Sequence, residues 1–281
     1  MEAASSISAL SDLWLTVGLI AVWWAYVRQS PTTDMGSSLS TSTDLHNLGD
    51  LYRDQGRMLE AEKVYIRALT QREKARGADH TSTLDTVNSL GIIYCKRGKL
   101  DEAGQMYLRA LAGREKALGA DHLCTLETVG NLGILYCFQG KLDKSEEVFK
   151  ELLARREEKL GADHISTIDT LHNLGNVYCA QGRLDEAQQM YIRALVGKEE
   201  KLGANDASTL DTVFNLGNLY RSQDKLDEAE QMYKRALAGT EISLGADHPS
   251  KIEIVDSLMN LYCSQGRLDK ARRLQLKLGG I

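Results

Sequence analysis

The tetrapeptide Gly-Ala-Asp-His recurs along the chain, and this recurrence constrains the fold more than any other feature. Its glycines, together with the glycine of a variant Gly-Ala-Asn-Asp, lie 42 residues apart, at Gly77, Gly119, Gly161, Gly203 and Gly245. A fixed period of this length indicates one supersecondary unit copied in tandem, with each copy burying its apolar face against its neighbours. Such arrays usually bind other chains, so the period also predicts a class of function.

Each copy carries the same two groups of residues, which predict two amphipathic helices. In the second copy Leu90 and Tyr94 are four residues apart, and Ala103, Tyr107 and Ala110 follow at spacings of four and three. These spacings place each group on one stripe of a helix. A glycine follows Leu90 directly and another separates the two groups, so we expect closely packed helices joined by a tight turn.

Three copies depart from this pattern. The last copy also ends early, as a capping repeat or a truncated one does. The departures are Ser145, Phe149 and Leu152 in copy three, Asp224 at the turn glycine of copy five, and Met259 and Gln275 at the first-helix glycine and second-helix aromatic of copy six.

The pattern resembles the tetratricopeptide repeat, whose signature has Leu-Gly-x-x-Tyr in helix A and Ala, an aromatic and Ala in helix B. The match covers about six copies, from about residue 41 to the C-terminus. The longer period is similar to the repeats of kinesin light chains and to arrays that follow nucleotide-binding domains in fungal and bacterial proteins. The resemblance implies an all-α fold, a right-handed superhelical solenoid of antiparallel helix pairs spanning residues 43–281.

The resemblance further implies a non-catalytic interaction scaffold or adaptor that binds a peptide or partner domain in a concave groove lined by the A helices. The alternative is the repeat portion of a nucleotide-dependent signalling regulator. Because the chain contains no Gly-x-x-x-x-Gly-Lys-[ST] loop, the NTPase domain would lie outside it. No non-repeating cluster of nucleophile, base and acid appears, so we expect no enzyme activity, no cofactor and no metal.

The candidate groove begins with the residue before each helix A leucine, which is mostly asparagine. A carboxamide both donates and accepts, so a row of them would hold the backbone of a bound peptide; a bond to the adjacent copy explains them equally well. Flanking positions would supply specificity, including an apolar patch for an anchor side chain, although internal packing explains its two isoleucines equally well. The candidate residues are Asn47, Asn131, Asn173, Asn215, His46, His172, Ile92, Ile134, Phe138, Phe214, Asn176 and Asn218.

Charged residues recur with the repeat as well. The net charge of -5 and the lack of a long basic run argue against nucleic-acid binding. Runs such as Arg114-Glu115-Lys116 predict solvated faces. Acidic residues near the start of helix A would favour basic peptides, but a serine three residues before four of them favours a capping box instead. These acids are Asp85, Glu127, Asp169, Asp211 and Glu253.

Most cysteines and histidines follow the period, which favours structural roles over catalysis. Four cysteines each follow the helix A tyrosine. Neighbouring helices pack about 8–10 Å apart, whereas a disulfide needs α-carbons within about 7 Å, so we expect reduced thiols. The linker histidines repeat because the linker repeats, and the variant at Gly203 lacks the histidine altogether.

A different segment precedes the array. Residues 1–30 include an uncharged apolar run, Leu13–Val27, that contains all three tryptophans. It resembles a membrane anchor with an aromatic belt, although fifteen helical residues reach about 22 Å and a hydrocarbon core is about 30 Å thick. A helix docked on the first repeat or on a partner is the alternative, as is a truncated N-terminus. Residues 31–42 are predicted to be a flexible linker, and the array is expected in the cytoplasm.

Overall fold

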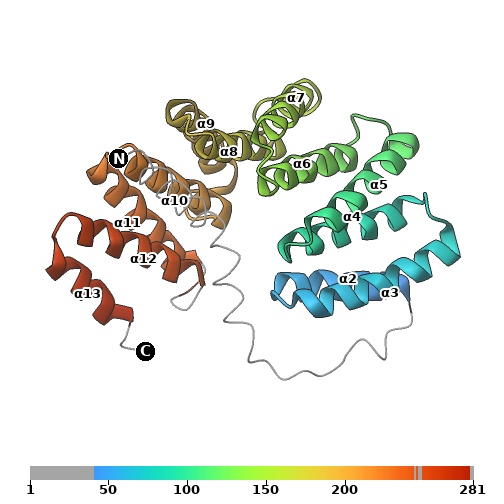
Figure 1. Cartoon of the computed structure of the whole chain (residues 1–281), viewed down its shortest axis with the longest axis horizontal. Helices are drawn as coiled ribbons and strands as arrows, with labels where there is room; N and C mark the ends of the chain where they lie inside the picture. The colour runs from blue at the N-terminus through green and yellow to red at the C-terminus, as the bar shows by residue number, and fades with distance from the viewer. Residues whose placement is uncertain (1–40, 244, 246–248, 279–281) are drawn as a thin grey trace, which may run out of the picture. The chain divides into compact units, whose positions relative to one another are not determined.

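The computed structural model describes residues 41–243, 245 and 249–278, and within these ranges every regular element is an α-helix (Figure 1). A helices alternate with B helices, most of which are longer. The A helices are α2 (Ser42–Asp54), α4 (Thr81–Lys96), α6 (Leu123–Phe138), α8 (Ile165–Ala180), α10 (Ala207–Ser222) and α12 (Pro249–Ser264). The B helices are α3 (Met58–Arg76), α5 (Leu100–Leu118), α7 (Leu142–Leu160), α9 (Leu184–Leu202), α11 (Leu226–Ser243) and α13 (Leu268–Leu278).

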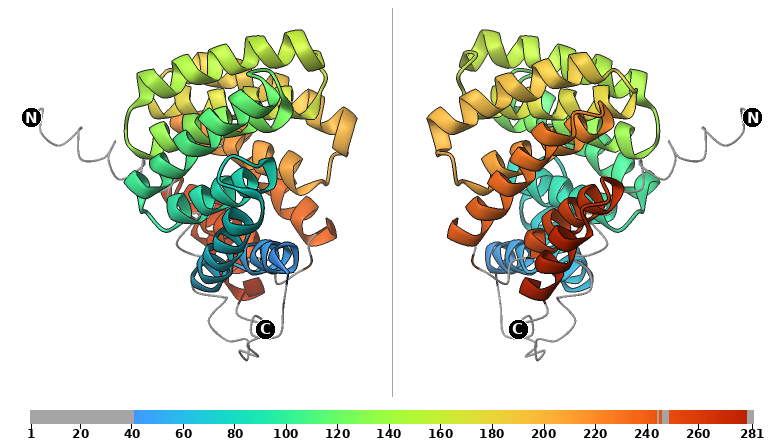
Figure 2. Two further views of the ribbon diagram at one scale, coloured as in Figure 1. Left: turned by 90° about the vertical axis from the view of Figure 1, so that its right-hand side faces the viewer. Right: turned by 90° about the vertical axis from the view of Figure 1, so that its left-hand side faces the viewer.

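The helices form two compact units, one ending at Lys159 and the other starting at Leu160. In the first unit α4 packs against α5 of its own copy and α3 of the preceding one. In the second unit α10 packs in the same way against α11 and α9. The additional views show these successive antiparallel hairpins from two sides (Figure 2). The predicted all-α fold of helix pairs is confirmed.

The first described helix begins at Ser42, the last residue of the predicted linker. Its N-cap is Thr41, whose side-chain oxygen accepts from the backbone N–H of Asp44 at 3.1 Å. The predicted anchor in residues 1–30 and most of the linker lie outside the described residues. Among the helices that are described, none combines the length and apolar character needed to span a bilayer.

The turn between helix A and helix B requires a backbone with positive φ. Gly98 and Gly182 have φ of 74° and 75°, a conformation that glycine adopts without a steric penalty. Asp224 takes this place in copy five with φ of 60°, and it is the one non-glycine residue with positive φ in the described ranges. Aspartate tolerates the left-handed region better than most residues, so copy five keeps the turn.

The helix A glycine is explained by the helix B aromatic ring, which lies directly against it. A Cβ atom added to Gly217 would stand 2.8 Å from the ring of Tyr233, too close for any side chain. Copy six changes both positions, with Met259 at the glycine position and Gln275 at the aromatic position. The predicted close packing of the two helices is confirmed. Copy six replaces both members of the pair, so it has a larger side chain in helix A and no aromatic ring in helix B.

Copy three accommodates its two larger helix B side chains in a similar way. The buried hydroxyl of Ser145 donates to the carbonyl oxygen of Gly133 at 2.7 Å, so its polar atom is satisfied. Leu152 is completely buried, and the facing helix has Gly130, where an added Cβ atom would contact it at 3.4 Å. In copy three the small residue of this contact therefore stands on helix A and the large one on helix B, so the packed volume stays similar.

The linker histidines are helix N-caps. Nδ1 of His80, His122 and His164 accepts from the backbone N–H two residues later, at 3.2 Å in each case. Asp206, in the variant linker, caps α10 with its carboxylate at 2.8 Å. The predicted structural role of these histidines is confirmed. The predicted capping box is wrong for Ser82, Ser166 and Ser208, because in each case the N-cap lies two residues before the serine.

Candidate functional site

The predicted groove residues lie on the A helices, at positions around the buried leucine of each copy. Because the structure has two compact units, α2, α4 and α6 form one candidate surface and α8, α10 and α12 form another. The helix A leucines from which these positions are counted are buried, and Leu90 and Leu174 are only 1% and 2% exposed. Their neighbours on the helix surface decide what each unit can bind.

Two asparagines of the predicted row are bonded to the preceding copy. Asn131 donates from Nδ2 to Oδ1 of Asn88 at 3.2 Å, and Nδ2 of Asn215 lies 3.4 Å from Nε2 of His172. Both contacts connect consecutive A helices, as the intramolecular interpretation expects. Each contact uses the amide nitrogen, and the Oδ1 atoms of Asn131 and Asn215 have no partner among the described residues.

The other two asparagines of the row have no such bond. Asn173 on α8 is partly exposed, and Asn47 on α2 is exposed. Neither side chain makes a hydrogen bond to another described residue. Asn173 and Asn215 occupy the same position on successive A helices of one unit, so together they present one uncommitted carboxamide and one uncommitted carbonyl oxygen.

The residue two positions after the leucine matches the chemistry of the helix B ring in four of the first five copies, and the exception is copy two, where Ile92 stands with Tyr107. Where the ring is a tyrosine, its hydroxyl donates to a polar side chain at this position in three copies. In copy three the ring is Phe149, which has no hydroxyl, and the position is occupied by Ile134. The bonded pairs are Tyr65 with Asp50 at 2.7 Å, Tyr191 with Asn176 at 2.5 Å and Tyr233 with Asn218 at 2.7 Å.

The predicted apolar anchor patch divides between the two units. Ile92 and Ile134 are partly buried and Phe138 is 38% exposed, all in the first unit. Phe214 belongs to the second unit and is only 5% exposed, with its ring 5.7 Å from that of Tyr233. Phe214 is therefore a core residue and not part of a ligand-binding patch, contrary to the prediction.

The two predicted groove histidines link consecutive A helices. His172 is 7% exposed, with Nδ1 3.0 Å from Oγ1 of Thr212 and Nε2 3.3 Å from a carboxylate oxygen of Asp211. His46 contacts the next A helix through the equivalent threonine. Burial and the nearby charge of Arg72 lower the pKa of His46. Both imidazoles therefore make polar contacts to the next A helix.

A row of buried cations on the B helices was missed by the sequence analysis. Arg114, predicted to lie on a solvated face, is 3% exposed. Its guanidinium donates at 2.7 Å to the carbonyl oxygen of Cys124, to Oγ1 of Thr128 and to Asp85. Lys198 has the same position in copy four and is 2% exposed. The signal was available, because a basic residue recurs every 42 residues at this position in copies one to four.

These cations give several of the helix A acids a role other than capping. Asp85 accepts from Arg114, and Asp169 lies 3.1 Å from Nζ of Lys198. Each carboxylate nevertheless remains nearly half exposed, at 46% and 45% of its side-chain surface. The A helix surfaces are therefore polar, with acids that are paired on one side and open to solvent on the other.

Glu253 on α12 lies in a region of negative potential. Burial and the charges of Asp211 and Asp256 raise the pKa of its carboxyl group to about 7. A group whose pKa is raised by folding stabilises the fold when protonated, and that contribution is lost as the pH rises through the folded-state value. Glu253 should therefore weaken the second unit above about pH 7.

Replacing Glu253 with glutamine should raise the free energy of unfolding by about 1 kcal/mol at pH 8, an effect reduced by solvent screening. The advantage should shrink as the pH falls towards the ordinary glutamate value of 4.5. Urea denaturation of both proteins at pH 5 and pH 8 measures the difference. The exposed Glu200, changed to glutamine, is the control, and an equal effect of the two substitutions at pH 8 would contradict the prediction.

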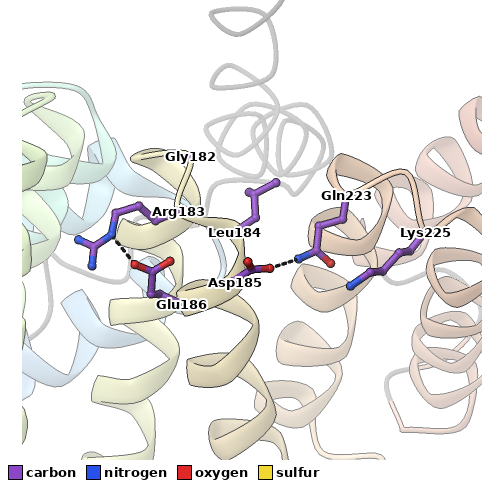
Figure 3. A pocket seen from close by; sticks show the side chains of 7 residues that line it. All are labelled: Gly182, Arg183, Leu184, Asp185, Glu186, Gln223 and Lys225. Carbon is purple, nitrogen blue, oxygen red and sulfur yellow. Dashed lines mark hydrogen bonds and ion pairs between the residues drawn. The ribbon is translucent and has the colours of Figure 1, made fainter.

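The second unit also contains an open polar cleft of about 510 Å³ at its helix A to helix B turns (Figure 3). Across it Gln223 donates to Asp185 at 3.4 Å, and within one rim Arg183 donates to Glu186 at 3.0 Å. None of the predicted groove residues lines this cleft. Its lining residues are Gly182, Arg183, Leu184, Asp185, Glu186, Gln223 and Lys225.

Burial suppresses the nucleophilic chemistry of three of the cysteines, Cys95, Cys137 and Cys179. All five are free, and burial raises the pKa of Cys95 and Cys179 to about 11, so these thiols stay protonated at neutral pH. Within the ranges that the structure describes, no three histidine, cysteine or acidic side chains gather in a way that would hold a metal ion.

Comparison with known proteins identifies the repeat. A family model described as tetratricopeptide repeat matches residues 41–116, 83–158, 125–200, 166–242 and 206–277. No curated protein matches the chain by sequence. Solved structures with the same fold include BtubC (BKLC) from P. vanneervenii, which is 20% identical with a TM-score of 0.64 over 80% of this chain and 92% of that one.

Two further solved structures share the fold of this chain. The nearly identical TPR-like repeats of a kinesin light chain candidate from Podosopora anserina are 21% identical, with a TM-score of 0.56 over 73% of this chain and 97% of that one. NprR in complex with its cognate peptide NprX is 13% identical, with a TM-score of 0.66 over 88% of this chain and 69% of that one. At these identities the likeness concerns the fold.

Proposed function

The chain belongs to the tetratricopeptide repeat family, and from this premise we propose that it is a non-catalytic scaffold whose A helices bind an extended peptide. The observation that carries the proposal is the arrangement of amide side chains on α8 and α10. Asn173 and the Oδ1 atom of Asn215 stand at equivalent positions on successive A helices, without partners among the described residues. Carboxamides so placed suit the backbone N–H and C=O groups of a peptide.

Two other features support this function. NprR, which has a similar fold, was solved with a bound peptide. The acidic residues along α8, α10 and α12 remain partly exposed, with 45% of the Asp169 side chain and 47% of the Asp211 side chain accessible. Their charge favours peptides that carry lysine or arginine. Tetratricopeptide repeats typically serve in protein interaction, which fits a scaffold.

Replacing both Asn173 and Asn215 with alanine should weaken peptide binding about tenfold, because two hydrogen bonds contribute about 0.5–1.5 kcal/mol each. Peptides are first selected from a random display library on the full chain, and their Kd values are then measured by calorimetry. The matched control replaces Gln189 and Gln231, exposed amides on α9 and α11, with alanine.

Three results would contradict the proposal. One is a selection that yields no peptide, and another is a double asparagine variant that binds selected peptides as tightly as the control. The third is saturable binding of Mg-ATP by the purified chain, which would favour a nucleotide-dependent regulator over a scaffold. Circular dichroism of both variants separates a loss of binding from a loss of structure.

A further inference from the structure

The first described helix pair exposes a strip of helix A that the later copies bury. Leu51 of α2 is 46% exposed, whereas its equivalents Ile93, Leu135, Val177, Leu219 and Leu261 are 0%, 1%, 1%, 2% and 0% exposed. Seven residues earlier Asp44 is exposed, and its equivalents Thr86, Thr128, Thr170 and Thr212 are all fully buried. Residues seven apart share one helix face, so Asp44 and Leu51 define one strip of α2.

In the later copies the preceding helix pair covers this strip. Ile93 belongs to the same buried cluster as Tyr65 and Ala68 of α3. Leu135 belongs in the same way to a cluster with Ala103 and Tyr107 of α5. The cover thus includes the aromatic and small residues of the preceding helix B. No described element precedes α2 to supply such a cover.

We propose that the apolar segment Leu13–Val27 of this chain docks on the α2 strip as a helix, in the place of a preceding helix B. The segment has fifteen uncharged, mostly apolar residues. Packing them on the exposed side chain of Leu51 would remove apolar surface from water, which is favourable. Its position in the repeat period is also that of a helix B. Residues Leu19, Trp23 and Tyr26 stand 42 positions before Ala61, Tyr65 and Ala68.

The chain between the segment and α2 is long enough for this arrangement. Thirteen residues separate Val27 from the N-cap Thr41, and extended chain spans about 3.3–3.6 Å per residue, or about 45 Å in total. The 13 residues of α2 form a helix about 20 Å long. The segment can therefore lie along the whole strip. Trp23, at the position of the helix B aromatic, is the residue that we expect to cover Leu51.

The three tryptophans of the chain all lie in this segment, so tryptophan fluorescence reports on it alone. The test uses the full chain with Trp14→Phe and Trp24→Phe, which leaves Trp23 as the single emitter. In lipid-free buffer its emission should be that of a buried indole. Adding Leu51→Lys should shift the emission to the red and raise acrylamide quenching about twofold, because the ring returns to water. Leu51→Ala should give a smaller shift in the same direction.

The matched control is Leu108→Lys on α5, a leucine that is 55% exposed and lies away from the strip. It should leave the emission unchanged, and circular dichroism checks that all variants keep their helices. Two results overturn the proposal. One is emission typical of a water-exposed indole in the protein with Trp14→Phe and Trp24→Phe, and the other is emission that stays the same when Leu51 is replaced. A blue shift that needs phosphatidylcholine vesicles assigns the segment to a bilayer. A blue shift that depends on protein concentration and ignores Leu51 assigns it to a second copy of the chain.

Discussion

Replacing Tyr233 with alanine should lower the free energy of unfolding of the second unit by about 3–5 kcal/mol, the range for removing a large buried aromatic side chain. Tyr233 is completely buried, and its ring lies against Gly217 and near the ring of Phe214. Its hydroxyl donates to Asn218 at 2.7 Å. The substitution therefore leaves a cavity between α10 and α11 and removes the donor to a partly buried amide.

The measurement is hydrogen exchange of α10 and α11 together with urea denaturation, because repeat arrays can open one part at a time. Ile242→Ala on the same helix is the control, since Ile242 is 73% exposed and its loss should cost less than about 0.5 kcal/mol. Tyr233→Phe removes only the hydroxyl and should cost about 1 kcal/mol. Equal effects of Tyr233→Ala and Ile242→Ala would show that the ring is not a core contact.

Replacing Arg114 with alanine should destabilise the first unit by about 3 kcal/mol, which is typical when one partner of a buried charged network is removed. The guanidinium joins α4 to α6 from its place on α5, through Asp85 on one side and Thr128 on the other. Without it the Thr128 hydroxyl loses the donor to its oxygen, and the carbonyl oxygen of Cys124 keeps the Thr128 hydroxyl as its side-chain donor. Arg114→Lys should recover much of the loss, because Lys198 serves at the same position in copy four.

Arg109→Ala is the matched control for this experiment. Arg109 lies on the same helix and pairs with Glu73, but 34% of its side chain is exposed, so its loss should cost less than about 1 kcal/mol. Thermal melting and urea denaturation of the three variants give the ranking directly. If Arg114→Ala costs no more than Arg109→Ala, the buried cation is not a stabilising link between copies.

The repeat period allowed much of the architecture to be predicted. The spacing of small and aromatic residues specified two helices per copy, and the contact of Gly217 with Tyr233 confirms the expected close approach. Such inferences succeed because packing inside a copy depends on residues close in sequence. The same period explained the linker histidines as structural, and the structure adds that Asp206 and His164 both cap helices.

Contacts between copies were harder to predict, because they depend on how one helix pair is set against the next. Arg114 is charged and so was assigned to the surface, yet it is buried between three helices. Phe214 was assigned to the groove, yet it lies in one buried cluster with Ile254 and Leu258 of the next copy. The row of asparagines falls between these cases, since only Asn131 and Asn215 contact the preceding copy and the role of the row towards a ligand stays a prediction.

The pairing of helix A glycine with helix B aromatic bears on how such a gene can grow or shrink. Recombination with crossover points in the linker would move each glycine together with the ring that packs on it. Gly217 and Tyr233 are such a pair, because the ring leaves no room for a side chain at the glycine position. A crossover inside the helix A to helix B turn would instead join Met259 to a copy that carries a tyrosine, and the two side chains would claim the same volume. Tolerated duplications should therefore begin and end at the linker.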